Sequence, residues 1–162
     1  MGTQSYAKIN LYLKIGRKLS SGYHNIQSVM QKIELSDNIN IEPISEDKVI
    51  IESTNKELEN ENNFAYKAAL LLKNKFKLRQ GARIFIEKNI PLEAGLGGGS
   101  SNAATTLLSL NKLWGLRLKE KELVNLASQI SSDVPFFIGD NAALVEGIGD
   151  KIKRIKKSFS IN

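Results

Sequence analysis

The sequence lacks cysteine and contains a single histidine, His24. Without cysteine the chain can form neither a disulfide framework nor a metal site with thiolate ligands. A single histidine also excludes a metal site built from several histidines. The residue types therefore point away from disulfide-stapled proteins and from multi-histidine metalloenzymes.

Long apolar runs are also missing, and no stretch is long enough to span a bilayer. The N-terminal sequence MGTQSYAKINLYLKIG alternates apolar and polar residues, which is typical of a strand and not of a signal peptide. We therefore expect no membrane partner and a cytoplasmic location. A chain of 162 residues can bury one core, so we expect residues 1–162 to form one domain.

Negative charge is in the minority, and the net charge is +6 with a pI near 9.5. One explanation is an anionic partner, such as a nucleotide, a phosphate ester or a nucleic acid. The other is a lysine-rich solvated surface. Much of the excess lies in KIKRIKK at 151–157. Charge alone does not decide between the two explanations.

Apolar periodicity predicts both strands and helices. Strands are predicted over 9–15, 26–33, 38–44, 48–53 and 82–90, and helices over 64–76 and 119–130. Segments 38–44 and 48–53 flank a polar turn, so they are predicted to pair as a hairpin. The segments DVPFFI and NAALVEGIG are predicted to be short and extended. This order of elements indicates an α+β domain with strands and helices in two layers.

The segment PLEAGLGGGSSNAATTLLSL, residues 91–110, places a glycine-rich loop before a predicted helix that starts near Ser100. Glycines can adopt positive φ and turn successive N–H groups inward as an anion-binding nest. The start of the helix adds unsatisfied N–H groups and the positive end of its dipole, which together favour a phosphate. Ser100 and Ser101 can cap the helix or bind a phosphate or its Mg²⁺. The structural alternative is a tight strand-to-helix turn with a serine cap.

Two common phosphate loops do not fit this segment. No lysine precedes the serines, as the GxxxxGK[ST] loop requires. A dinucleotide fingerprint needs GxGxxG after a first strand and an acidic residue about twenty positions further on. The spacing of GLGGGSS matches that pattern poorly.

The segment PLEAGLGGGSSNAA resembles the phosphate-binding motif of the GHMP kinases, the family of galactokinase, homoserine kinase and mevalonate kinase. Three further stretches support the resemblance: AKINLYLKIGRKLSSGYHNIQSV at 7–29, SSDVPFFIG at 131–139 and ALVEGIGDKI at 143–152. They are similar to the branch that phosphorylates a methylerythritol hydroxyl linked to cytidine diphosphate, in non-mevalonate isoprenoid biosynthesis. The resemblance implies a two-layer α+β fold, ribosomal protein S5 domain 2-like, with residues 1–162 as the N-terminal ATP-binding domain.

The resemblance also implies roles for individual residues. Asp133 corresponds to the proposed catalytic base, and Lys8 to the active-site lysine. Alone, Asp133 would be interpreted as a turn residue and Lys8 as a solvent-facing lysine. The expected ATP-binding residues are Gly95, Leu96, Gly97, Gly98, Gly99, Ser100, Ser101, Asn63, Phe64 and Lys88. The expected substrate-binding residues are Asn10, Tyr23 and His24, the last two at the cytidine end. Mg²⁺ is expected to accompany ATP, and no protein ligand for it is identified.

Two departures from the family pattern stand out. Members are usually near twice this length, with a second domain after the ALVEGIGDKI segment. We therefore expect the 162-residue chain to have impaired activity and to self-associate through surface that the second domain would cover. The chain is then a fragment, a truncated gene product or one of two separate chains. Ser131 stands where many members have glycine, and we expect strain there if the position needs positive φ.

Three alternatives remain open. Another GHMP kinase acceptor, such as homoserine or mevalonate, would share the glycine loop. A basic nucleic-acid-binding module of related fold would use the positive charge, although a nucleic-acid partner is not expected. A non-catalytic nucleotide-binding fragment would keep only the loop.

Overall fold

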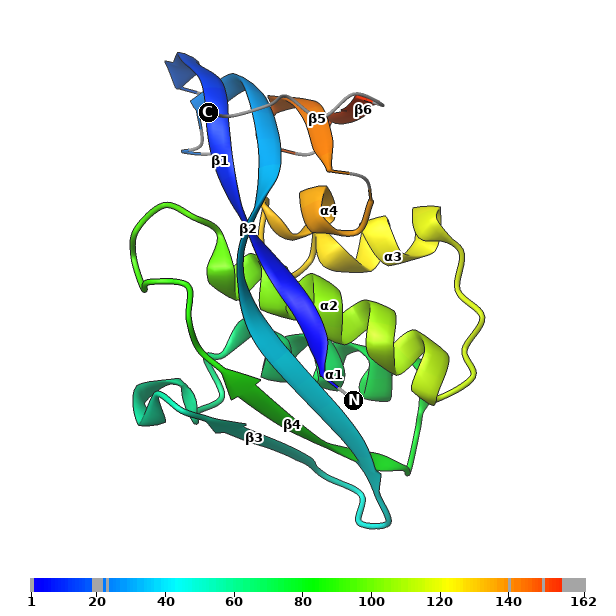
Figure 1. The fold of residues 1–162 in the computed structure, drawn as a ribbon. Helices are drawn as coiled ribbons and strands as arrows, with labels where there is room; N and C mark the ends of the chain where they lie inside the picture. Colours follow the sequence, from blue (N-terminus) through cyan, green and yellow to red (C-terminus); the bar gives the residue numbers. More distant parts are fainter. Residues whose placement is uncertain (1, 19–21, 23, 140, 150, 156–162) are drawn as a thin grey trace.

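The computed structural model describes residues 2–18, 22, 24–139, 141–149 and 151–155 (Figure 1). The strands are β1 (Thr3–Lys18), β2 (His24–Ile44), β3 (Val49–Ser53), β4 (Gly81–Glu87), β5 (Ala142–Gly147) and β6 (Lys151–Ile155). The helices are the 3₁₀ turn η1 (Lys56–Leu58), α1 (Phe64–Phe76), α2 (Gly98–Leu113), α3 (Glu120–Ala127) and α4 (Val134–Phe137). None of the helices in this described part is long and apolar enough to cross a membrane.

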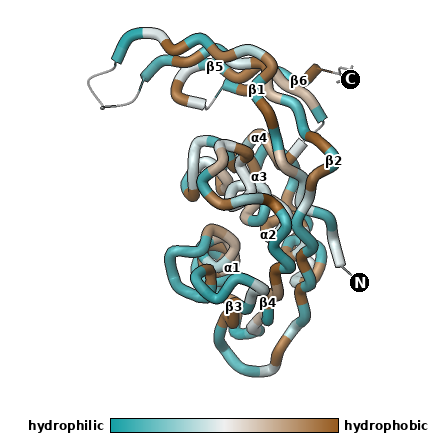
Figure 2. The backbone as a smooth tube through the Cα atoms, turned by 60° about the vertical axis from the view of Figure 1, so that its left-hand side comes forward, coloured by the Kyte–Doolittle hydropathy of each residue, from teal (hydrophilic) through white to brown (hydrophobic). Residues whose placement is uncertain are grey.

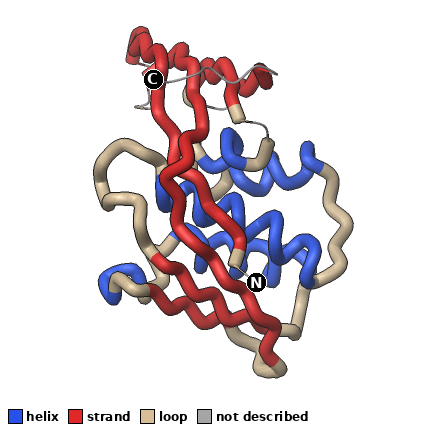
Figure 3. The backbone as a smooth tube through the Cα atoms, viewed as in Figure 1, coloured by secondary structure: helices blue, strands red, loops and turns tan. Residues whose placement is uncertain are grey.

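The strands form one sheet in the order β3-β4-β2-β5-β6, and β1 pairs with β2 on its other edge. All pairs are antiparallel except β3 with β4. The four α-helices lie on one side of the sheet (Figures 2 and 3). The predicted two-layer α+β architecture is confirmed.

Strand β2 joins two segments that the sequence pattern predicts as separate strands, 26–33 and 38–44. It runs unbroken for 21 residues because β1 pairs with it from Ile39 back to His24. Its first half also pairs with β5 and its second half with β4. As a result, β1 and β2 form a long ribbon that extends beyond the helices (Figure 1).

The predicted hairpin between 38–44 and 48–53 is wrong. Strand β4 lies between β2 and β3, antiparallel to the first and parallel to the second. Gly81 makes this insertion possible, because a Cβ there would overlap the carbonyl oxygens of Glu46 and Lys48. The turn after β2 can therefore cross directly over the start of β4.

One further prediction fails near the C-terminal end. The segment 133–138 is not extended, because Val134, Pro135, Phe136 and Phe137 form the short buried helix α4. A bond from the N–H of Phe136 to the carbonyl of Asp133 closes its first turn. The basic segment also contains a strand, since 151–155 pair with β5 as the edge strand β6. Residues 156 and 157 lie outside the described part.

The core lies between the sheet and the helices. Ile39, Ile84, Ile86 and Val145 from the sheet meet Leu72, Leu107, Leu110 and Phe136 from the helices, all buried. Alanines at 65, 68 and 69 of α1 and at 103 and 104 of α2 are fully or almost fully buried. Such small side chains let helix backbones approach closely, which brings the starts of α1 and α2 near the same end of the sheet.

Candidate active site

The glycine loop leads into helix α2, whose N-terminus has no side-chain cap. Gly95 and Gly97 have φ of 72° and 70°, the left-handed region that favours glycine. Gly97 is the N-cap of α2 and provides no side-chain cap hydrogen bond. The N–H groups of Gly98, Gly99 and Ser100 donate to no described residue, and the first bond is from the N–H of Ser101 to the carbonyl of Gly97. The helix starts two residues before the predicted position, and the alternative of a serine-capped turn is wrong.

Close packing explains two of these glycines. A Cβ at Gly97 would lie 3.0 Å from Cζ of Phe137 and 3.1 Å from Cγ of Lys8. A Cβ at Gly98 would lie 3.0 Å from Nζ of Lys88. The loop therefore rests directly on two lysine side chains, and its free N–H groups are those of the first helical turn.

Ser100 and Ser101, in the first turn of α2, have different surroundings. Ser101 is buried, and its hydroxyl accepts a hydrogen bond from the hydroxyl of Ser5 at 2.8 Å. Ser100 is 7% exposed, and no partner for its hydroxyl is found within the described ranges. Ser100 is therefore the serine whose hydroxyl remains available to a phosphate or a metal ion beside the free N–H groups.

Lys8 and Asp133 lie together beside this loop. Lys8 comes from β1, and its Nζ is 3.7 Å from Oδ2 of Asp133, the residue before α4. The N–H of Lys8 donates to the carbonyl of Leu96 at 2.9 Å, which fixes β1 to the glycine loop. Lys8 is buried, so its interpretation as a solvent-facing lysine is wrong. The fold thus brings a cation, a carboxylate and the free N–H groups into one place.

Asn10 extends this cluster along β1. Its Oδ1 accepts from Nζ of Lys8 at 2.7 Å, and its Nδ2 donates to Oγ of Ser28 at 2.7 Å. The hydroxyl of Ser28 in turn donates to the carbonyl of Tyr12. This chain of bonds fixes the orientation of the Asn10 amide and, through it, the position of the Lys8 ammonium.

Ser131 adopts no strained conformation. It is absent from the described non-glycine residues with positive φ, which are Lys77, Glu93 and Arg117. The strain expected at this position is therefore not found. Its hydroxyl accepts from the N–H of Asp133 at 3.5 Å, so the serine helps to orient the segment that carries the carboxylate.

A cavity of about 250 Å³ adjoins the loop. Asn63, Phe64 and Lys88, the three residues expected around the nucleotide base, all line it. Leu58, Asn60, Asn62, Leu92, Gly99 and Asn102 complete the lining. Sequence reasoning missed Asn60 and Asn62, which lie in the polar stretch TNKELENENN at 54–63, and Asn102 of α2. Gly99 joins the cavity to the glycine loop.

Only part of this lining is free to bind a ligand. The Oδ1 of Asn63 accepts from the N–H of Ala65 at 2.8 Å as the N-cap of α1. The ammonium of Lys88 is bound to Asp37 and to the carbonyl of Ile90. The ring of Phe64 and the aliphatic stem of Lys88 are therefore the surfaces that these residues can offer to a base.

A larger cavity of about 520 Å³ shares Phe64 with the first. Residues 128–132, Pro135 and Ile148 also line it. Ser131 and Ser132, next to Asp133, contribute polar atoms. Sequence reasoning did not identify this larger cavity, which lies between the 250 Å³ cavity and the Asp133 segment.

The substrate-binding prediction is only partly tested by position. Tyr23 lies outside the described residues. His24 is exposed at the far end of the ribbon and pairs with Lys18. Asn10 pairs with Met30, six residues further along β2, so the separation is roughly 20 Å at about 3.3 Å per residue. The structure therefore does not bring His24 to Lys8 and Asp133.

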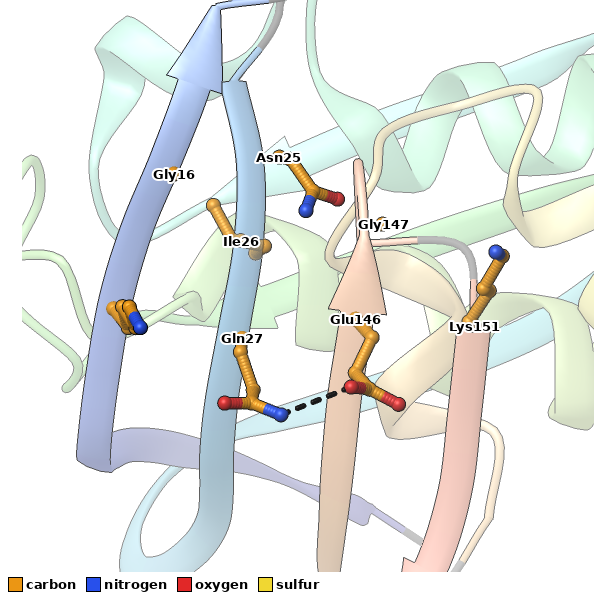
Figure 4. A pocket seen from close by; sticks show the side chains of 8 residues that line it. Gly16, Asn25, Ile26, Gln27, Glu146, Gly147 and Lys151 are labelled. Atoms are coloured by element: carbon orange, nitrogen blue, oxygen red, sulfur yellow. Dashed lines mark hydrogen bonds between the residues drawn. The ribbon is translucent and has the colours of Figure 1, made fainter.

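An irregularity in the pairing of β1 with β2 separates His24 from the cluster. The pairing of β1 with β2 shifts register between Ile15, opposite Ile26, and Lys18, opposite His24. A cavity of about 350 Å³ nearby is lined in part by Asn25, Ile26 and Gln27 (Figure 4). Gln27 donates to Glu146 at 3.0 Å across it. We assign no role in the reaction to this cavity of about 350 Å³.

The described residues hold no group of three or more histidine, aspartate or glutamate side chains placed to bind a metal ion. Ser100, in the first turn of α2, and Asp133, beside Lys8, are the oxygen-bearing side chains that the site offers to a metal ion. A metal ion carried by a nucleotide would thus take most of its ligands from the nucleotide and from water.

The chain is similar to known proteins over much of its length. The model of the GHMP kinases N terminal domain matches residues 63–141. A 4-diphosphocytidyl-2-C-methyl-D-erythritol kinase from Caldicellulosiruptor saccharolyticus is 46% identical over 160 residues, 98% of this chain and 55% of the relative. Its counterpart from Clostridioides difficile is 47% identical over 154 residues, 94% of this chain and 52% of the relative. The chain thus spans about half the length of the curated relatives it matches.

Solved structures share the fold. A crystal structure of 4-(cytidine 5'-diphospho)-2C-methyl-D-erythritol kinase is 34% identical with a TM-score of 0.82, covering 96% of this chain and 55% of that one. The mevalonate kinase of Methanococcus jannaschii has a TM-score of 0.71 at 18% identity, over 97% of this chain and 56% of that one. The second likeness concerns the fold alone.

Proposed function

Because the chain belongs to the GHMP kinase family, whose N-terminal domain it carries, we propose that it forms the nucleotide-binding part of a small-molecule kinase. The reaction transfers the γ-phosphoryl group of ATP to the methylerythritol hydroxyl of 4-diphosphocytidyl-2-C-methyl-D-erythritol, a step of non-mevalonate isoprenoid biosynthesis. The observation that carries the proposal is the position of Lys8 and Asp133 beside the free N–H groups at the start of α2.

The glycine loop accounts for binding of the phosphates. The free N–H groups of Gly98, Gly99 and Ser100 and the positive end of α2 favour a polyanion. The adjoining cavity of about 250 Å³ that Phe64 lines, the base cavity, is of a size to hold part of a base. Gly99 belongs both to the glycine loop and to the lining of this cavity. Bound Mg²⁺ would neutralise phosphate charge, with the Ser100 hydroxyl as the protein group suited to it.

Asp133 and Lys8 account for the chemical step. Phosphoryl transfer needs positioning, charge neutralisation and a group that accepts the hydroxyl proton. Asp133 is 32% exposed at its side chain, so an acceptor hydroxyl can reach its free carboxylate edge and pass its proton to it. The Lys8 ammonium offsets negative charge where the transferred group and the carboxylate meet. Asn10 holds that ammonium and contributes an amide at the acceptor end.

The acceptor follows from the ribbon and from the named relatives. His24 lies roughly 20 Å from Asn10 along β2, a distance that a diphosphate-linked nucleoside can span. We assign the methylerythritol end to Asn10 and the cytidine end to His24 and Tyr23. Homoserine and mevalonate are too short to use both positions, so we rank them below the cytidine-linked acceptor.

The test is a binding and transfer experiment on the 162-residue chain. Calorimetric titration with MgATP should show binding, and mass spectrometry with the cytidine-linked acceptor should show a phosphorylated product. We expect turnover well below the usual kinase range of about 1–100 s⁻¹, because the relatives contain about as much chain again. Failure to bind MgATP contradicts the proposal. Binding without any transfer supports the alternative of a non-catalytic nucleotide-binding fragment.

A further inference from the structure

Asp37 is a buried carboxylate for which the reaction described above has no direct use. It lies within β2 and is fully buried. Burying an ionised carboxylate is costly unless it is paired and hydrogen-bonded. Its Oδ2 accepts from Nζ of Lys88 and from Nδ2 of Asn102 at 2.8 and 2.9 Å. Its Oδ1 accepts from the N–H groups of Asn89 and Ile90 at 2.7 and 2.8 Å.

The donors to Asp37 come from both sides of the glycine loop. Residues 88–90 follow β4 directly and lead into the loop, whereas Asn102 lies in α2, after the loop. One carboxylate thus fixes where the loop begins and where it ends. Closing a flexible loop between fixed ends reduces the conformations that its free N–H groups can sample.

The Asp37 network also forms the base on which the loop rests. The ammonium of Lys88 donates to the carbonyl of Ile90 at 2.6 Å as well as to Asp37. Gly98 packs against this ammonium and against Ile90, with 3.0 Å from its Cβ position to each. A change in the position of Lys88 would therefore displace the first residue of α2.

A second branch of the network determines which serine faces inward. Asn102 donates to the hydroxyl of Ser5 at 3.0 Å, and that hydroxyl donates to Ser101 at 2.8 Å. Ser5, Ser101 and Asn102 are all buried. Because Ser101 is held on the β1 side, Ser100 keeps its unpartnered hydroxyl beside the free N–H groups.

We propose that Asp37 is a positioning residue for the nucleotide, which holds the phosphate loop at a set distance from the base cavity through Lys88 and Asn102. The inference rests on the proposed nucleotide-binding function. It also assigns Lys88 a structural role. The charge of Lys88 neutralises Asp37, and only its aliphatic stem faces the base cavity. Asp37 itself touches neither the base cavity nor the phosphate site.

The chain contains a matched control for this role. Lys73 is likewise buried, and its Nζ binds Asp47 at 2.6 Å and the carbonyls of Leu78 and Gln80. This pair joins the end of α1 to the turn before β3, away from the loop. Loss of Asp47 removes one acceptor from a buried lysine, as loss of Asp37 does, without touching the nucleotide site.

The experiment compares Asp37→Asn with Asp47→Asn in the full chain. We measure the Kd of MgATP by calorimetry and the ¹⁵N order parameters of residues 97–101 without nucleotide. Asp37→Asn should weaken binding at least about tenfold, since bonds to charged groups are the stronger class. Its loop order parameters should fall from about 0.85 towards 0.6. Asp47→Asn should change neither quantity.

The opposite result overturns the inference. Asp37→Asn with a Kd within about twofold of the parent, and with unchanged loop order parameters, would show that the carboxylate only stabilises the fold. If Asp37→Asn does not fold, Ser5→Ala removes the second branch without adding or removing charge. It should loosen residues 100 and 101 and weaken binding a few-fold, and the absence of both effects would equally contradict the inference.

The two proposals can fail separately. If the parent chain binds no MgATP, the proposed function fails, whereas the order parameters still decide whether Asp37 holds the loop. If the parent binds and Asp37→Asn binds equally well with an equally ordered loop, only the inference about Asp37 fails.

Discussion

The ammonium of Lys8, on the first strand, lies 3.7 Å from the carboxylate of Asp133, on the segment before α4. Between them in sequence lie most of the sheet and three of the α-helices. The same lysine contacts Gly97 and bonds Leu96 through its N–H group. Four testable predictions follow from this arrangement and from its surroundings.

Asp133→Asn should separate chemistry from binding. We expect phosphoryl transfer to fall by at least about 10²-fold, the usual contribution of a positioned general base. The Kd of MgATP should stay within a few-fold, because the loop N–H groups are unchanged. Rates are measured by mass spectrometry and Kd by calorimetry. Asp47→Asn is the control, and an equal loss of transfer in both variants would contradict a catalytic role for Asp133.

Gly97→Ala should weaken nucleotide binding as well as stability. Its positive φ costs roughly 1–2 kcal/mol for a residue with a Cβ, and the new methyl would press on Lys8 and Phe137. Gly115→Ala is the matched control, since Gly115 has φ of 62° with nothing within 4 Å of the added Cβ. Urea denaturation should show a loss in both variants. Calorimetry should show weaker MgATP binding only in Gly97→Ala, and equal affinities would argue against a built phosphate site.

Phe64→Leu tests the base cavity. Loss of an aromatic face that stacks on a base costs about 1–3 kcal/mol, so the Kd of MgATP should rise about fivefold or more. Inorganic triphosphate should bind equally well to both proteins, because it uses only the loop. Phe85→Leu, which changes a ring that is 39% exposed, is the control. A Phe64 variant with the affinity of the parent for MgATP would place the base elsewhere.

Glu59 should make the segment beside the base cavity sensitive to acid. The pKa of Glu59 lies below its ordinary 4.5, chiefly through the hydrogen bond from Lys56 and next through that from the N–H of Ser53. A lowered pKa stabilises the folded state above the ordinary value, and this contribution disappears as pH falls through the lowered pKa. Glu59→Gln should therefore be less stable than the parent at pH about 7 in urea denaturation, and the difference should vanish in acid. A difference that persists at a pH where Glu59 is protonated in the folded protein would exclude this origin.

Several elements could be predicted because their signals are local. Helix α1 was predicted at its observed bounds, since the helix formers of 64–76 follow the Asn63 cap. The glycine loop could be identified from composition, because few structures other than a close backbone approach need so many adjacent glycines. The motifs at 7–29 and 131–139 indicated Lys8 and Asp133 through resemblance, although the residue types alone favoured a solvent-facing lysine and a turn aspartate.

Other features depend on partners that are distant in the chain. The apolar pattern of 38–44 and 48–53 is equally compatible with a hairpin and with an intervening strand. Strand β4 can lie between them only because Gly81 has no side chain to collide with the turn after β2. The segment VPFF is apolar in either conformation, and its helical turn depends on burial between α2 and α3. Asp37 falls between the predicted strands 26–33 and 38–44, so nothing near it in sequence indicates that it binds both ends of the loop.

Short-range chemistry was thus enough to predict an α+β chain with a glycine-rich loop before a helix. Backbone freedom at glycine and amphipathic periodicity act over a few residues, and both are visible in the letters. Long-range packing decided which side chains meet there: Lys8 with Asp133, Asp37 with Lys88 and Asn102, and Ser5 with Ser101. These contacts join strands and helices far apart in sequence. Their geometry arises only when the sheet and the helices bury a common core.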